Sequence, residues 1–194
     1  MNLANKNIGF AMTGSYCTFA RVMEELRNLK KTGANIQPIM SENVYSTDTR
    51  FGKAEDFIWE VEDITEKKII KNIKEAEPIG PKKLLDLLIV TPCTGNTLAK
   101  LANGITDTSV TLAVKAHLRN QRPVLLGVST NDGLGNAAKN IGTLLNVKNM
   151  YFIPFSQDDF ENKPNSLVAD FSKLIPSAEA ALDNKQLQPV LLRL

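Results

Sequence analysis

The sequence has little with which to build a metal site. It contains one histidine, and its two cysteines, Cys17 and Cys93, lie far apart in the chain. Zinc sites need ligands in close pairs, so this spacing fits none of the common patterns. We therefore expect no bound metal. A disulfide between the two cysteines is also not expected in a chain with the features of an intracellular protein.

Long apolar runs and blocks of one charge are also missing. No apolar run reaches the roughly 18 residues that a membrane helix requires, and the N-terminus MNLANKNIGF lacks the apolar region of a signal peptide. The formal net charge is +2 and aromatic residues make up 6%, which argues against nucleic acid as a partner. We expect a soluble, cytoplasmic protein that binds neither membranes nor nucleic acids.

The chain does contain enough apolar residues, 43%, to bury one core. Short apolar runs without alternation predict strands buried on both faces, at residues 7–12, 34–40, 84–90, 123–128 and 149–155. Apolar residues at three- and four-residue spacing predict a helix from Phe19 to Leu29 that Gly33 ends, and helices are expected at 53–75, 107–120 and 136–146. This alternation predicts an α/β fold with a doubly wound parallel sheet, Rossmann-like, in a single domain over residues 1–194. Residues 156–194 are expected to form a C-terminal helix, over 164–182, and a tail that packs on another protomer.

Four loops follow the predicted strands and share one chemistry. They are rich in Gly, Ser, Thr and Asn, and they span residues 13–18, 41–52, 91–97 and 129–136. Ligands of such sheets bind beyond the carboxyl ends of the strands, where these loops should meet. Small hydroxyl residues beside the free N–H groups of helix starts can hold a phosphate. The sequence Thr13-Gly14-Ser15 fits that role, although it matches neither GxGxxG nor the P-loop motif. Alternatively, Ser15, Asn96 and Ser129 are ordinary helix N-caps.

A few other residues have chemistry that a site could use. Arg50, in a polar loop, could hold a carboxylate through two parallel hydrogen bonds, or it is a solvated loop charge. His117 is interpreted as a helix-surface residue rather than a general base. Cys93 is either a nucleophile beside a helix N-terminus or a small buried residue. Arg21 and Arg119 are explained as solvated faces of helices. No Ser–His–Asp or paired-carboxylate spacing is present, so no catalytic residue is assigned.

Two separated motifs carry a resemblance to a known family. TPCTGNTLAKLANGITD, residues 91–107, resembles the PxTANTxAKxANGxxD signature of the flavoprotein family that includes flavin-dependent cysteine decarboxylases and flavin prenyltransferases. GFAMTGSYCT, residues 9–18, matches the first phosphate loop of that family, and the match spans roughly residues 6–155. The resemblance implies bound flavin mononucleotide (FMN). Its phosphate would meet Gly14, Ser15, Ser41 and Thr97, with Thr13 beside them. Its isoalloxazine ring would lie against Thr94, Gly95 and Asn96, and the pocket would be closed by Ser129, Thr130 and Asn131.

The chain departs from the decarboxylase branch of this family at two places. That branch has a catalytic histidine before the third strand, where this chain has IGPKK at residues 79–83. Its PAMN loop corresponds to STND at residues 129–132. Both departures argue against cysteine decarboxylation, and they leave open whether flavin is bound or only phosphate.

Further segments are similar to one branch of the family, the B chains of dipicolinate synthases. They are residues 9–23, 46–52, 76–86, 122–135 and 152–166. This resemblance implies a protein that helps convert a hydroxy-tetrahydrodipicolinate precursor to dipicolinate during sporulation, in the mother cell. The chain has no nicotinamide fingerprint, so NADP would be bound by a separate A chain, and a homo-oligomer is expected. Two alternatives stay open: a stand-alone FMN-dependent decarboxylase or prenyltransferase, and a non-catalytic protein that supports assembly of the A chain.

Overall fold

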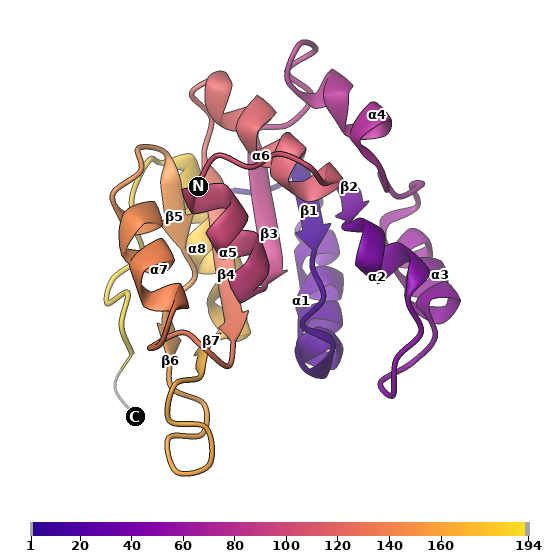
Figure 1. Cartoon of the computed structure of the whole chain (residues 1–194). Coiled ribbons are helices and arrows are strands. Elements are labelled where there is room, and N and C mark those ends of the chain that lie inside the picture. Colours follow the sequence, from indigo (N-terminus) through magenta and orange to yellow (C-terminus); the bar gives the residue numbers. More distant parts are fainter. Residues whose placement is uncertain (1, 193–194) are drawn as a thin grey trace.

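The molecule is one α/β domain built on a mostly parallel sheet (Figure 1). The structure, a computed structural model, describes residues 2–192. Five strands run parallel, in the spatial order β2-β1-β3-β4-β5, and their bounds are β1 Asn7–Met12, β2 Asn35–Met40, β3 Leu87–Cys93, β4 Val124–Thr130 and β5 Met150–Phe152. The chain passes from β1 to β2 on one side and then returns to β3 on the other. This confirms the predicted doubly wound sheet.

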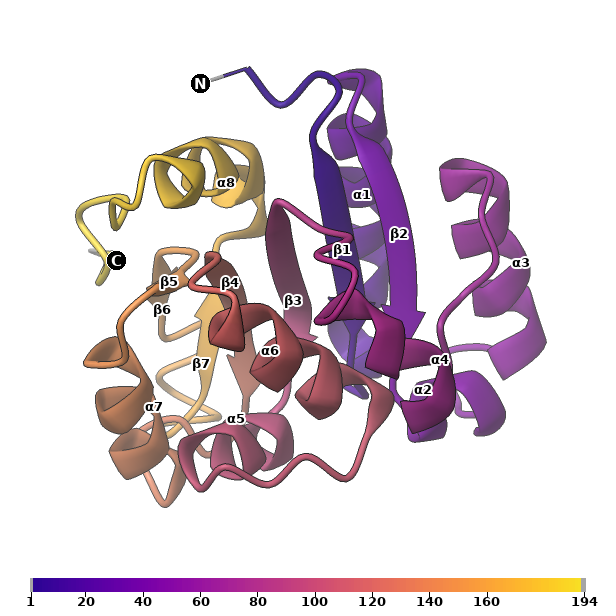
Figure 2. The same cartoon turned by 90° about the horizontal axis from the view of Figure 1, so that it is seen from above.

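Helices cover both faces of the sheet (Figure 2). One face carries α1, Phe19–Lys31, after a short 3-10 turn at Tyr16–Thr18, and α8, Leu174–Leu182. The other carries α4 Ile73–Ala76, α5 Gly95–Ala102, α6 Ser109–Arg119 and α7 Ala137–Leu145. Beside the β2 edge lie α2, Glu42–Ser46, and α3, Ala54–Thr65. No helix in residues 2–192 is both long and apolar enough to cross a membrane.

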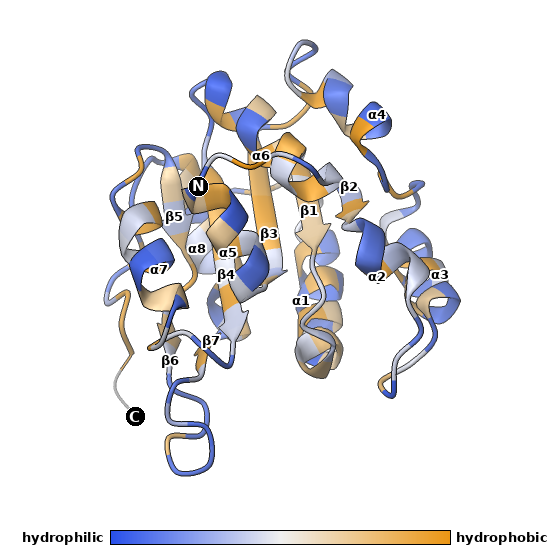
Figure 3. Ribbon diagram, viewed as in Figure 1, coloured by the Kyte–Doolittle hydropathy of each residue, from blue (hydrophilic) through white to orange (hydrophobic). Residues whose placement is uncertain are grey.

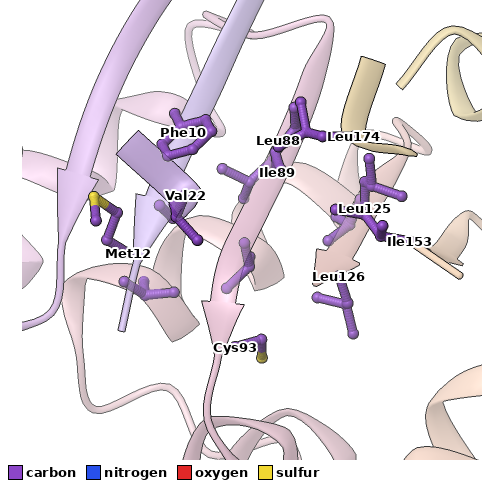
Figure 4. Close-up of a cluster of buried hydrophobic side chains, with 14 of the residues drawn as sticks. Phe10, Met12, Val22, Leu88, Ile89, Cys93, Leu125, Leu126, Ile153 and Leu174 are labelled. Atoms are coloured by element: carbon purple, nitrogen blue, oxygen red, sulfur yellow. The ribbon is translucent and has the colours of Figure 1, made fainter. Parts of the chain in front are cut away.

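The core lies between these layers. Apolar strand residues such as Phe10, Ile89 and Leu125 are fully buried and meet Val22 of α1 and Leu174 of α8 (Figure 4). Because the central strands are covered on both faces, their sequences are continuously apolar. The hydropathy pattern shows the same division, with apolar strands and hydrophilic loops beyond their ends (Figure 3). The predicted apolar stripe of α1 is confirmed as a buried face.

The helix predicted over residues 53–75 is wrong as one element. It divides into α3 and α4 because Glu66 takes a left-handed conformation, with φ of 58°, and ends α3. The next apolar pair, Ile69 and Ile70, then lies along the sheet edge. The Ile70 N–H donates to the Pro38 carbonyl, and the Ile70 carbonyl accepts from the Met40 N–H of β2. Burial of this pair at the edge strand outweighs the helical tendency of the charged residues around it.

The C-terminal part also differs from the prediction. The run at 149–155 splits into β5 and β6, Phe155–Ser156, and the expected helix over 164–182 begins only at Leu174. Before it lies β7, Leu167–Ala169, which pairs antiparallel with both β4 and β6. The backbone of the tail pairs with Phe155 of the same chain, through Val190 and Leu192; residues 193–194 lie outside the described residues. Packing of the tail on another protomer stays a prediction.

Candidate functional site

The ends of β1 and β3 are fastened together at the point where the sheet changes winding direction. The Thr13 hydroxyl donates to the Pro92 carbonyl at 2.8 Å and accepts from the Thr94 backbone N–H at 3.0 Å. The Thr13 backbone N–H also donates to Pro92, at 3.2 Å. Ligands of doubly wound sheets bind in the crevice outside this point. Thr13 was predicted to lie beside a phosphate. Its hydroxyl is instead used within the protein, where it fixes the ends of β1 and β3 relative to each other.

Helix α5 begins in the same crevice. Thr94 is its N-cap and accepts a hydrogen bond from the Thr97 backbone N–H at 3.2 Å. Gly95 lies so near the end of β4 that an added Cβ would be 2.7 Å from the Thr130 hydroxyl oxygen. Glycine is therefore required for this close approach. The first N–H groups of an α-helix have no partner within the helix, so the start of α5 offers donors to a ligand.

A cleft of about 300 Å³, which we name the cradle cleft, opens between these elements and α2. Its walls carry the polar residues Thr13, Gly14, Ser41, Asn43, Thr94, Asn96, Thr97 and Thr108, with the charged Glu42 and Lys100. The structure thus brings together Gly14, Ser41 and Thr97, three of the four residues expected around a phosphate. The Ser41 side chain makes no capping hydrogen bond to α2, so its hydroxyl is available to a ligand.

Two charged residues of the cradle cleft were missed from the sequence. Lys100 extends its ammonium group to Asp107, at 2.8 and 2.9 Å. Glu42 accepts a hydrogen bond from the Ser109 backbone N–H at 3.0 Å through one oxygen, and its other oxygen is buried without a partner in residues 2–192. Spacing gave no signal for Glu42, because it comes next to the cleft only through the short α2 helix.

A second, larger cleft adjoins the first and is named here the cation cleft. It measures about 480 Å³, and Gly14 and Thr94 line both clefts. Its inner wall is formed by Gly95 and by Ser129, Thr130 and Asn131 at the end of β4. The hydroxyl groups of Ser15 and Ser129 lie 2.7 Å apart and join the start of the first helix to β4.

Two residues lie apart from most of the residues with which the resemblance groups them. Ser15 lines the cation cleft, and Asn96 lines the cradle cleft. The alternative interpretation as helix N-caps is wrong for Asn96, which lies inside α5, and for Ser129, which lies in β4. Ser15 stands at the N-cap position of the 3-10 turn, but its side chain makes no capping hydrogen bond.

Long cationic side chains form the outer wall of the cation cleft. Arg50 lies there with its guanidinium group over the Phe51 ring, 4.9 Å from the centroid. Arg21 lines the same cleft, 5.3 Å from the centroid of the Phe171 ring. The sequence interpretation of Arg21 as a solvated helix face missed this position. The wall is completed by Lys163 and Asp158, from the loop between β6 and β7, and by the exposed Cys17.

His117 and Cys93 take no part in either cleft. The interpretation of His117 as a helix-surface residue is wrong: its side chain is buried, and Nε2 lies 3.0 Å from the Pro123 carbonyl. Burial lowers the pKa of His117 to about 4. Cys93 is buried in the core, and burial raises the pKa of its thiol, so the nucleophile alternative is wrong. Residues 2–192 contain no cluster of three or more His, Cys, Asp or Glu side chains that could hold a metal.

Comparisons with known proteins show which proteins this chain is similar to. The chain is 47% identical over 190 residues to the B chain of dipicolinate synthase from Bacillus subtilis (strain 168), covering 98% of this chain and 95% of that protein. It also matches the crystal structure of the dipicolinate synthase B chain from Bacillus halodurans C, with a TM-score of 0.91 and 46% identity over 100% of this chain and 99% of the other. The FMN-dependent cysteine decarboxylase SpaF shares the fold at 18% identity, with a TM-score of 0.65 over 95% of this chain and 99% of SpaF. The family model described as Flavoprotein matches residues 1–162, and the chain belongs to that family.

Proposed function

We propose that the chain binds FMN across the two clefts. The cradle cleft receives the phosphate, with Gly14, Ser41 and Thr97 around it. The isoalloxazine ring lies in the cation cleft against Thr94, Gly95 and the β4 end, residues 129–131. Ser15, in the cation cleft next to Gly14, and Asn96, in the cradle cleft, complete the site.

The donor set of the cradle cleft supports this proposal. Serine and threonine hydroxyls and the N–H groups at the start of α5 suit the oxygens of a phosphate ester. The carboxylate of Glu42 does not suit phosphate, but its buried oxygen without a partner is suited to a hydroxyl donor, which the ribityl chain of FMN carries. A ligand that combines both groups fits the cleft better than inorganic phosphate does.

The function that the site supports best is that of one component of a dipicolinate-forming oxidoreductase. One observation carries it: the near full-length similarity to the dipicolinate synthase B chain, at 47% identity. The precursor, a hydroxy-tetrahydrodipicolinate, loses water and two hydrogens to become dipicolinate. One hydrogen leaves as a proton and the other as a hydride, whose final acceptor is NADP bound by a partner A chain. FMN, when bound, would supply two-electron redox chemistry between the substrate and NADP.

Within this function, the residues of the chain bind and position. Thr13 and the Thr94 cap fix the strand ends, and Gly95 lets the start of α5 lie against Thr130 at the end of β4. Arg50 binds a substrate carboxylate at the rim of the cation cleft. The only histidine of the chain, His117, is buried and bonded to Pro123. It therefore offers no proton donor or acceptor to the clefts, which argues against the histidine-dependent decarboxylase alternative.

Reconstitution with the A chain tests the proposal. We expect the purified chain to carry a flavin spectrum, and dipicolinate to form at full rate only when both chains are present. Dipicolinate absorbance, NADPH formation and flavin reduction are followed together, with each chain alone as a control. A colourless chain that still stimulates the A chain would favour the assembly role, and decarboxylation or prenyl transfer by this chain alone would favour the stand-alone enzyme.

The cellular setting follows from the same proposal. Dipicolinate formation belongs to sporulation, so the protein acts in the mother cell of a spore-forming bacterium, in its cytoplasm. A homo-oligomer remains a prediction, and sedimentation of the FMN-loaded chain measures it.

A further inference from the structure

The cation cleft has an unusual charge balance. The charged side chains that line it are Arg21, Arg50, Lys163 and Asp158, an excess of two positive charges in one cleft. In other clefts of the molecule the lining cation is paired with an acid, as Arg27 is with Glu60 and Lys100 with Asp107. A protein with a net charge of +2 has enough carboxylates to neutralise these side chains. The excess inside one cleft therefore points to an anionic ligand.

The two guanidinium groups are held by aromatic rings rather than by acids. Arg21 lies over Phe171 and Arg50 over Phe51, and within residues 2–192 neither forms an ion pair. A ring restrains the plane of a guanidinium group without consuming its N–H donors. Both arginines thus keep the planar fork that binds a carboxylate through two parallel hydrogen bonds.

Lys163 is also incompletely paired. Its ammonium group lies 3.9 Å from one Asp158 oxygen, too far for a hydrogen bond, while the other Asp158 oxygen accepts from the Ser166 hydroxyl. The lysine is carried by the loop between β6 and β7, residues 157–166, which extends beyond the strand ends (Figure 1). The loop that carries Arg50, residues 47–53, extends on the other side of α1 in the same view. Arg21 lines the same cleft and stacks on Phe171, in the segment that follows the Lys163 loop and β7 in the chain.

We propose that the cation cleft is a two-ended dicarboxylate site, in which Arg50 binds one carboxylate and Arg21 and Lys163 bind the other. The proposal rests on the proposed function and adds to it the residues that select a diacid. Arg21 and Lys163 determine specificity, because a monocarboxylate of the same ring size leaves one pair of donors empty. The phosphate of FMN is not the expected partner, because the cradle cleft already supplies its hydroxyl and N–H donors.

Calorimetric titration of the FMN-loaded chain tests this assignment. Dipicolinate is compared with picolinate, which has the same ring and one carboxylate, in metal-free buffer. We expect dipicolinate to bind at least tenfold more tightly than picolinate. Arg21→Gln and Lys163→Gln should each weaken dipicolinate binding about tenfold or more and reduce the preference over picolinate. Arg119→Gln is the matched control: it removes the same charge from an exposed position at the far end of α6 and should change neither affinity by more than twofold.

FMN affinity, measured on the same variants, separates the two anions. The proposal requires it to stay within twofold in Arg21→Gln and Lys163→Gln. If these variants lose FMN and keep their affinity for dipicolinate, the cations hold the cofactor and the proposal is overturned. Equal binding of dipicolinate and picolinate by the unaltered chain, or no binding of dipicolinate, also overturns it. The proposed function is judged separately, by reconstitution with the A chain: it fails if dipicolinate formation does not need this chain or needs it only as a colourless partner.

Discussion

The two clefts are neighbours at one sheet edge, yet they are built in opposite ways. The cradle cleft is formed by strand ends and helix starts, and two of its threonines, Thr13 and Thr97, are buried. The outer wall of the cation cleft is formed by long, exposed side chains, Arg21, Arg50 and Lys163, of which the last two lie on loops. A ligand in the first meets short groups fixed by the backbone. A ligand in the second meets charges at the ends of flexible stems.

This difference indicates which cleft determines cofactor binding and which determines substrate specificity. Short hydroxyls and helix N–H groups are positioned by the fold itself, so they can hold a cofactor without losing side-chain entropy. Charged loop residues can be replaced without moving a strand, so they can set which substrate is bound. Changes in the cradle cleft should therefore affect flavin binding, and changes at the rim of the cation cleft should affect substrate alone.

The largest effect is expected from a negative charge next to Gly14, the residue that lines both clefts. Ser15→Asp puts a carboxylate there. At an effective dielectric near 20 and a separation of about 4 Å from the phosphate, the repulsion is on the order of 4 kcal/mol. FMN titration should show affinity weakened by orders of magnitude in a folded protein. Ser15→Asn, the neutral counterpart, should lose far less, and equal FMN affinity in Ser15→Asp and the unaltered chain would contradict the site.

The second effect concerns His117, near the C-terminal end of α6, and tests whether this region is independent of the two clefts. The pKa of His117 is lowered from 6.5 to about 4 by burial. Between these values the unfolded chain binds a proton that the folded chain does not, so stability falls as the pH drops from 6.5 toward 4. The loss is on the order of 3 kcal/mol in the free energy of unfolding.

Chemical denaturation across this pH range measures that loss. Carboxylates titrate there too, so the curve of His117→Gln, in which an amide can still donate to Pro123, is subtracted. The difference between the two stability curves should give the contribution of His117 to the pH dependence. FMN affinity at neutral pH should be the same in both proteins, and a large change would show that the two ends of α6 are coupled.

The third effect concerns the fastening under the cradle cleft. Thr13→Val keeps the shape of the side chain but removes the donor to Pro92 and leaves the Thr94 N–H without its acceptor. A buried polar group left unpaired costs about 1–3 kcal/mol, and we expect about 2 kcal/mol in the free energy of unfolding. FMN affinity should fall as well, because the start of α5 loses its position. Thr106→Val, in the loop between α5 and α6, is the control for a Thr-to-Val substitution. If the two variants are equally stable, the hydrogen bonds of Thr13 to Pro92 and Thr94 contribute nothing to stability.

The sequence predicted the cradle side well for a physical reason. Continuous apolar runs mark strands buried on both faces, and the polar residues that directly follow them must lie at their carboxyl ends. Thr13, Gly14, Thr94 and Thr97 are placed by that rule. The sequence did not show which cleft Ser15 and Asn96 line, because a single residue of offset at a helix start decides which cleft a side chain faces.

The cation side was less predictable because its residues meet only through tertiary structure. Arg21 lies off the apolar stripe of α1, and only the packing of Phe171, far along the chain, shows that it lines a cleft. Lys163 lies in a loop whose position depends on β7, a three-residue strand too short for periodicity to reveal. His117 was misplaced for a related reason: its spacing on α6 does not tell that its ring bonds to the Pro123 carbonyl.

The smallest effect, and the one that separates the clefts most sharply, is expected at Arg50. Arg50→Lys keeps the positive charge at the rim but loses the planar fork and the stacking over Phe51. Charge-assisted hydrogen bonds contribute about 1.5–3 kcal/mol, and the exposure of Arg50 places the expected loss near the lower end, at about 1–2 kcal/mol of substrate affinity. Steady-state kinetics with the A chain should show this as a raised KM for the dicarboxylate, while the flavin content stays unaltered. Because a lysine can still attract a carboxylate, Arg50→Ala should lose more than Arg50→Lys. Unchanged kinetics in Arg50→Ala would make Arg50 a solvated loop charge and leave substrate binding to the other side of the cleft.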